Sequence, residues 1–179
     1  LRTALSLWWD RDAGLEQVKW FEDARRTATL GRLRTSTVKL MLDGVLENFT
    51  GALLEPYLDA AGHATANTGI DFIDPERLAG VIAPALDAAG FQLHFHAIGD
   101  RAVRSALDAV ETVRRVNEPR DRRPHAAHIQ VVHPDDLPRF GALGVGANMQ
   151  PFWAVYEAQM RDLTIPFLGP ERSRWLYPI

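Results

Sequence analysis

Short apolar runs alternate with helical patterns along the chain, and this alternation restricts the fold more than any other feature of the sequence. We predict five strands, near residues 1–9, 35–44, 91–99, 125–132 and 145–151. Helical spacing of apolar residues predicts helices between them, near 15–25, 74–90, 100–116 and 133–144. An order of β-α-β-α calls for a mainly parallel sheet covered by helices, in a doubly wound fold or a barrel. The fold class is therefore α/β.

Local signals set the expected ends of these elements. Asp74 is the candidate N-cap of a helix that has Pro75 at its first position, and Asp100 is the candidate N-cap of the next helix. Pro84 should kink or end the helix in which it lies. The segment at about 45–72 is rich in Gly, Thr and Asn, with at most a short helix over 53–60. We interpret this segment as a long lid or binding loop.

Composition narrows the classes of partner. A chain of 179 residues with 46% hydrophobic and 24% charged residues predicts a soluble single domain over 1–179. The net charge of -3 gives no basic field, so we expect no nucleic-acid or membrane partner. No apolar window is long enough for a membrane span and no secretory signal is visible, which leaves the cytoplasm as the default location. Without cysteine, any metal must be held by His, Asp, Glu or a modified Lys.

Histidines and a lysine occur at like positions in successive units. His94 and His96 alternate on a strand and so share one face, and His128 lies near the end of the next strand. Catalytic groups of parallel α/β folds gather at carboxyl ends of strands. Lys39 stands inside an apolar strand, where a charge needs a partner. A single strand histidine is more often a hydrogen-bonded core residue, and Lys39 can equally reach a rim or pair with Asp43. Together, however, the three positions favour a metal site over three unrelated residues.

Other chemistries are less well supported. The Gly pair at 144–146 precedes its strand, which is wrong for a dinucleotide-binding turn, and no G-x-S-x-G elbow is present. Several aromatic residues are candidates for a substrate pocket or an exposed surface, and equally for an ordinary core: Trp8, Trp9, Tyr57, Phe152 and Trp153.

Three stretches taken together carry a family resemblance: "VKLMLDGVLENFTGALLEPY", "HFHAIGDRAVRSALDAVE" and "AHIQVVHPDDLPRFGALGVGANMQP". In this order they resemble the YtcJ-like branch of the metal-dependent amidohydrolases, amidohydrolase family 3. The resemblance extends over 38–178. It implies a partial (β/α)8 TIM-type barrel, roughly strands 3 to 7 with their helices.

The resemblance also implies roles for individual residues. Lys39 matches the fourth-strand lysine, which can be carbamylated, His96 the fifth-strand histidine and His128 the sixth-strand histidine, all of them metal ligands. The metal would be divalent, most often Zn²⁺, with one or two ions in a complete enzyme. Supporting or substrate-pocket positions are His94, Asp43, Asp100, Gln150 and Trp153.

Departures from the family pattern concern the remaining ligands. The first-strand His-x-His should precede this sequence, and the catalytic aspartate is expected beyond Ile179, so we assign no catalytic residue within the chain. Ala127 stands where many relatives have Glu. Reading 94–96 as the first-strand His-x-His would leave two β-α units upstream and no histidines at the later strand ends, and we reject that reading.

The expected function is that of a fragment of a metal-dependent hydrolase that cleaves amide-like C–N bonds in a small molecule, such as an N-acyl, N-formyl or cyclic amide. The piece by itself should turn over little substrate, with at most weak binding of one Zn²⁺ through His96 and His128. Open barrel edges favour a homo-oligomer. The alternative is a non-catalytic α/β binding or assembly module on the same scaffold.

Overall fold

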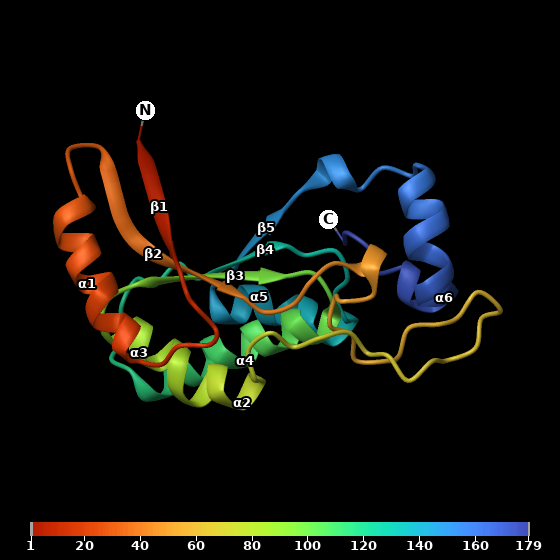
Figure 1. Ribbon diagram of the computed structural model, residues 1–179, viewed down its shortest axis with the longest axis horizontal. Coiled ribbons are helices and arrows are strands. Elements are labelled where there is room, and N and C mark those ends of the chain that lie inside the picture. Colours follow the sequence, from red (N-terminus) through yellow and green to blue (C-terminus); the bar gives the residue numbers. More distant parts are fainter. Residues whose placement is uncertain (1, 179) are drawn as a thin grey trace.

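A five-stranded parallel sheet forms the centre of the molecule in the computed structural model, which describes residues 2–178 (Figure 1). Leu1 and Ile179, the ends of the predicted domain, lie outside the described residues. The strands are β1 (Thr3–Trp8), β2 (Leu33–Met41), β3 (Gln92–Ala97), β4 (His125–His128) and β5 (Gly146–Met149). The helices are α1 (Glu16–Ala28), α2 (Pro75–Arg77), α3 (Ala83–Ala88), α4 (Asp100–Val116), α5 (Leu137–Leu143) and α6 (Ile165–Ser173). This arrangement confirms the α/β class.

The strand order follows the order of the chain. Each strand pairs in parallel with the next, so the sheet runs β1-β2-β3-β4-β5. A doubly wound sheet would instead reverse direction at a switch point. Consecutive parallel pairing is the pattern of a barrel segment, in agreement with the predicted partial barrel. Within the described residues β1 and β5 each pair with one strand, so the sheet stays open.

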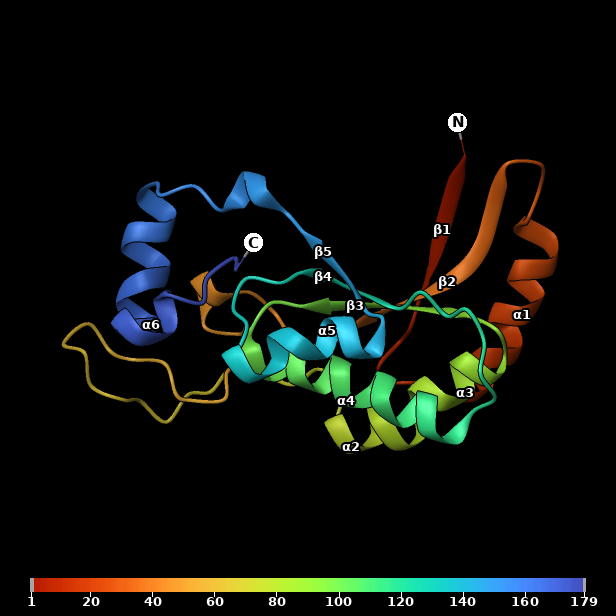
Figure 2. The same cartoon turned by 180° about the vertical axis from the view of Figure 1, so that it is seen from behind.

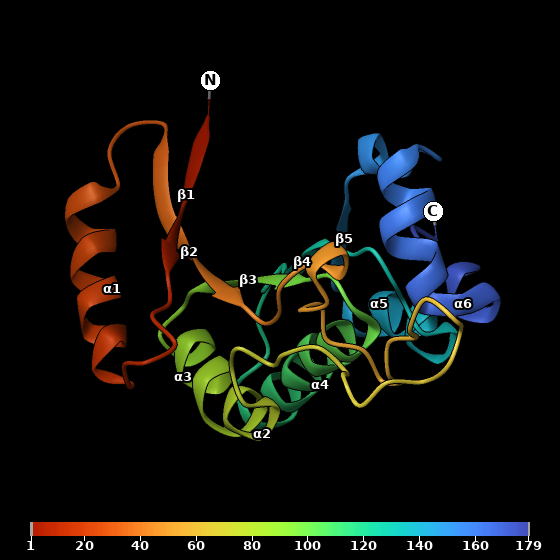
Figure 3. The same ribbon diagram turned by 45° about the vertical axis from the view of Figure 1, so that its right-hand side comes forward.

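Helices cover one face of this sheet. Figures 1 and 2 show α2 to α5 beneath β3, β4 and β5, and the view in Figure 3 places α1 beside β1 and β2. The C-terminal helix α6 stands at the opposite end, near the C-terminus. The face of the sheet turned away from α2 to α5 is the one that carries the polar residues described below.

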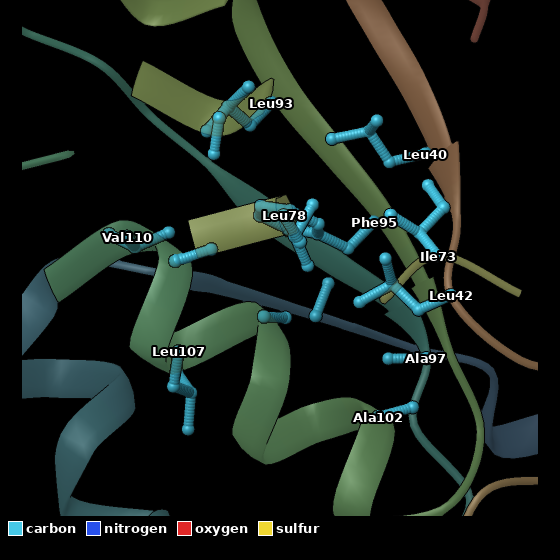
Figure 4. Close-up of a cluster of buried hydrophobic side chains, with 14 of the residues drawn as sticks. Leu40, Leu42, Ile73, Leu78, Leu93, Phe95, Ala97, Ala102, Leu107 and Val110 are labelled. Atoms are coloured by element: carbon cyan, nitrogen blue, oxygen red, sulfur yellow. The ribbon is translucent and has the colours of Figure 1, made fainter. Parts of the chain in front are cut away.

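The main core lies between the sheet and its helices (Figure 4). Alternation along the strands sends Val38, Leu40 and Phe95 toward the helices, where each is fully buried, and leaves Lys39 and His94 on the other face. The apolar stripe of α4 covers them, and each buried Leu or Phe contributes about 1.5–3 kcal/mol relative to exposure. Packing against α4 therefore fixes which side chains of β3 face the candidate site.

The helix signals had different outcomes. Asp74 caps its helix as predicted, accepting from the Arg77 N–H at 2.8 Å. The helix is distorted next to Pro84, where a wide turn over Leu78–Ile82 comes just before the proline, but it continues to Ala88 rather than ending at Pro84. Asp100 is not an N-cap. Gly99 takes that position, and the Asp100 carboxylate accepts from the Leu54 N–H at 2.9 Å.

Two strand and loop predictions also need correction. The predicted strand over 125–132 pairs only as far as His128, where the chain turns through positive φ at His128 and Ile129. No helix forms over 53–60 among the described residues, because the N–H groups of Leu53 and Tyr57 bond instead to residues further along the loop. Residues 45–72 contain one 3₁₀ turn, at Leu46–Asn48, and an isolated bridge between Leu58 and Ala64, and otherwise form neither helix nor strand.

A buried carboxylate holds the sheet end opposite the candidate site. Asp87 is 2% exposed and accepts from Asn117, Arg120 and Arg122 at 2.8, 2.6 and 2.9 Å. Substituting Asp87→Ala leaves two guanidinium groups unpaired, and we expect a loss of about 3–5 kcal/mol in the free energy of unfolding, measured with urea. The control Asp121→Ala removes an exposed partner of Arg123 and should cost less than about 1 kcal/mol. Equal effects would contradict this account.

No helix within residues 2–178 combines the length and apolar character that crossing a membrane requires.

Candidate metal centre

His96 lies on β3, one residue before the strand ends, and is 6% exposed. Its Nε2 atom is 3.0 Å from the Gly44 carbonyl oxygen. Because a carbonyl only accepts, Nε2 carries the proton and Nδ1 keeps its lone pair. Burial lowers the pKa of His96 to about 4, although the bond to Gly44 opposes this shift. The imidazole is therefore neutral at pH 7, as a metal ligand must be.

His128 ends β4, the neighbouring strand, and its Nδ1 atom lies 2.9 Å from Gln150 Oε1. With the amide oxygen as acceptor, Nδ1 donates and Nε2 is left with a lone pair. The backbone at His128 has φ of 81° and at Ile129 φ of 40°, a region unfavourable for a β-branched residue. The turn directs the chain away from the sheet immediately after the imidazole.

The two imidazoles lie side by side over the edge of a cavity. Their ring centroids are 4.7 Å apart, a span that one cation bridges when each Zn–N bond is about 2 Å. The cavity has a volume of about 300 Å³ and is bounded by β3, β4, the segment after β5 and the start of the long loop. Its lining residues are Val45, Glu47, His96, Ile98, His128, Gln130, Gln150, Trp153, Val155, Glu157, Gln159, Met160 and Tyr177.

Lys39 belongs to a different contact. It pairs in register with His94 on β3, and its Nζ atom is 2.9 Å from His94 Nε2. Ser6 Oγ lies 3.2 Å from His94 Nδ1, so both nitrogens of His94 are engaged and neither is available to a metal. Burial lowers the pKa of Lys39 to about 8 and that of His94 to about 3. Lys39 and His94 thus form a second polar layer on the same sheet face, and Lys39 does not line the cavity.

Asp43 is a buried carboxylate next to His96 that accepts hydrogen bonds from backbone N–H groups. It is fully buried, and its carboxylate accepts from the N–H groups of Ala52, Ile98 and Gly99 at 2.9, 3.0 and 2.9 Å. Its Oδ1 lies 3.6 Å from His96 Nε2. Burial raises the pKa of Asp43 to about 7, and the three N–H donors act in the opposite direction. Asp43 ties the end of β2 to the long loop and to the turn that follows His96.

The other predicted pocket residues separate into two groups. Gln150 and Trp153 line the cavity, and Trp153 is about half exposed. Asp100 does not line it, because its carboxylate is turned toward Leu54 and holds the long loop. Among the remaining aromatic candidates, Trp9 and Tyr57 are core residues, whereas Trp8 and Phe152 are exposed.

Several lining residues were missed by the sequence reasoning. Glu47 lies in the 3₁₀ turn of the long loop, Gln130 two residues beyond His128, and Tyr177 near the C-terminus. Gln130 could have been found, because residues two apart on a strand share a face and the predicted strand 125–132 would have placed Gln130 on the same face as His128. No signal in the sequence marks Glu47 or Tyr177, since both reach the cavity only through loop folding.

The residues present fit a divalent cation in part. Two imidazoles, His96 and His128, each have one ring nitrogen without a hydrogen-bond partner among the described residues beside a cavity, which is half of a tetrahedral ligand set. Within residues 2–178 no group of three or more His, Asp and Glu side chains is arranged to hold a metal. The sheet pairs its parallel strands in chain order and carries histidines near the ends of two adjacent strands, and solved metal-dependent hydrolases resemble this chain.

The chain belongs to the amidohydrolase family, whose sequence model matches residues 3–179. It is 36% identical over 136 residues to the Arabidopsis thaliana protein LONG AFTER FAR-RED 3, covering 76% of this chain and 22% of that protein. It is 32% identical over 137 residues to the putative amidohydrolase YtcJ of Bacillus subtilis, covering 76% of this chain and 24% of that protein. An uncharacterized metal-dependent hydrolase from Pyrococcus furiosus superposes with a TM-score of 0.71 at 30% identity, over 91% of this chain and 32% of that one. The chain thus spans about a quarter of the length of these two curated relatives.

Proposed function

We propose that this chain carries part of the active site of a hydrolase that uses a divalent metal, Zn²⁺ by preference, to cleave amide-like C–N bonds. The observation that supports this most directly is the pair of imidazoles at neighbouring strand ends, each with one nitrogen engaged and the other free. The lone pairs support His96 Nδ1 and His128 Nε2 as the ligand atoms.

The chain's own residues prepare this site in three ways. Gly44 and Gln150 accept from His96 and His128 and so fix the tautomer and orientation of each ring. Asp43 holds the backbone that follows His96, through the N–H groups of Ile98 and Gly99. The cavity beside the rings gives room for a small substrate. A metal bound there would polarise a carbonyl and lower the pKa of a bound water.

Lys39 takes a secondary role in this proposal. In the described geometry its amine bonds to His94, so it reaches the metal only if a longer, carbamylated side chain extends along the sheet face. Since the chain presents two imidazoles rather than a complete ligand set, we propose that the isolated chain binds metal weakly and hydrolyses N-acyl or N-formyl amides little or not at all.

Metal binding tests the proposal directly. Chelator-treated chain is titrated with Zn²⁺ by calorimetry, beside the variant His96→Ala/His128→Ala. We expect one site in the wild type, and a loss of affinity of at least about tenfold in the double variant, because second-shell changes alone already cost 10- to 100-fold.

The matched control is His63→Ala/His133→Ala. It removes the same number of imidazoles from one exposed position, His63, and one partly exposed position, His133, both outside the cavity, and should bind Zn²⁺ like the wild type. Equal affinity in all three proteins would reject His96 and His128 as the ligands and favour the non-catalytic module.

A further inference from the structure

The charge of the cavity wall is one-sided. Two of the described lining residues are acidic, Glu47 and Glu157. No Lys or Arg lines it. Substrates that carry a carboxylate commonly need an arginine or lysine to receive it. The described part of the cavity offers no such group.

The Glu47 carboxylate forms no ion pair with a Lys, Arg or His side chain within residues 2–178. The carboxylate is half-buried in the 3₁₀ turn of the long loop, where Oε1 accepts long hydrogen bonds of 3.4 Å from Gln130 Nε2 and Thr164 Oγ1. Neither donor is charged. No ion pair to Glu47 occurs within residues 2–178, although arginines elsewhere in the same region of the chain are paired with carboxylates.

Gln130 adds a second acceptor at the same wall. Its side chain belongs to a residue that is 4% exposed, and its backbone carbonyl is used by the Tyr177 N–H. Nε2 donates to Glu47, whereas Oε1 accepts no hydrogen bond from the described residues and is not enclosed. This amide oxygen can therefore accept a hydrogen bond from a ligand or a water molecule in the cavity.

Apolar surface completes the wall. Ile98, Trp153 and Met160 line the cavity, and Trp153 is half-exposed. Carboxylate and amide acceptors together with an indole ring and apolar side chains suit a ligand that has a positively charged N–H group next to a flat or apolar portion.

We infer that this cavity selects cationic substrates, amides that carry an ammonium or amidinium group, and rejects carboxylates, with Glu47 and Gln130 as the recognition pair and Glu157 as a supporting charge. The inference rests on the proposed function for the identification of the cavity as the substrate site. Recognition of the cation itself requires only the described residues.

Three probes with the same benzamide ring test the inference: 4-(aminomethyl)benzamide, 4-methylbenzamide and 4-carbamoylbenzoate. Binding to the chelator-treated full chain is measured by ligand-observed NMR titration. We expect the cation to bind about tenfold more tightly than the neutral amide, the equivalent of one charge-assisted hydrogen bond, and the carboxylate not to bind detectably. The preference for the cation should decrease as salt rises.

Variants locate the effect. Glu47→Gln keeps the shape of the side chain and should reduce the preference for the cation to about threefold or less, and Glu157→Gln, at an exposed position, should reduce it by a smaller factor. The control Glu76→Gln makes the same charge change on exposed α2 and should leave the preference intact. Equal binding of the three probes, or an unchanged preference in Glu47→Gln, would overturn the inference.

Zn²⁺ titration of the same samples separates the two proposals. Zn²⁺ binding without a preference for the cation would reject the cationic substrate class alone. A preference for the cation without Zn²⁺ binding would reject the metal site and leave the recognition of cations standing.

Discussion

Gly99→Ala is expected to destabilise the chain by about 3 kcal/mol or more, or to prevent folding. A Cβ at this position would lie 2.0 Å from the Ala52 carbonyl oxygen and 2.6 Å from its carbon, and these are backbone atoms that cannot rotate away. Gly99 has φ of -82°, so the expected effect is purely steric. Urea denaturation measures it, and the chemical shift of the His96 ring reports any displacement of the strand end.

The control for this substitution is Gly80→Ala. Gly80 lies in the wide helical turn, and a Cβ there would meet nothing within 4 Å. Because alanine is favoured over glycine in helical backbone, we expect a gain of about 0.5–1 kcal/mol. If Gly99→Ala were as stable as Gly80→Ala, the close approach of the long loop to the strand end would be wrong.

Asp43→Ala should have an effect of similar size. Asp43 is fully buried, and its removal takes away the carboxylate that accepts from three backbone N–H groups. Each donor left unsatisfied costs about 1–3 kcal/mol. Asp43→Asn keeps one oxygen but turns an NH₂ group toward N–H donors, so we expect it to rescue only part of the stability. Zn²⁺ affinity should fall together with stability, because the turn after His96 loses its anchor.

Asp12→Ala is the control for the loss of one carboxylate in Asp43→Ala. Asp12 is exposed in the turn before α1, and its removal changes the net charge equally. We expect a change within about 0.5 kcal/mol. A comparable loss in Asp12→Ala would attribute the effect of Asp43→Ala to net charge rather than to the three N–H groups.

Periodicity and strand-end positions were sufficient to predict the sheet and the histidine pair. All five strands form at the short apolar runs that predicted them, although the fourth ends at His128 rather than at residue 132, since burial of one face against helices leaves little freedom in register. His96 and His128 could be placed at adjacent strand ends for the same reason. Such predictions succeed because they depend on repeating local geometry.

Contacts made by loops could not be predicted in this way. Asp100 had the sequence of an N-cap, yet a backbone N–H of the long loop competes for its carboxylate. Lys39 was grouped with His96 and His128, but its amine is placed next to His94, directly across the sheet in register. Glu47 reaches the cavity through a turn with no periodic pattern. Each of these contacts depends on which of several residues distant in sequence forms the hydrogen bond or packs alongside. A single sequence does not show which of them does so.

The two imidazoles belong to one β-α-β unit, β3-α4-β4, and therefore meet through contacts that are short in sequence. The chain entropy lost in closing that unit grows only slowly with its length, so the pair needs little help from the ends of the chain. Formation of β3-α4-β4 early in folding would bring the rings together before the long loop has settled over them. For the proposed metal site, this means that both ligand side chains come from one contiguous segment, 92–128, whereas the rest of the cavity wall, apart from Ile98, comes from segments on either side of it.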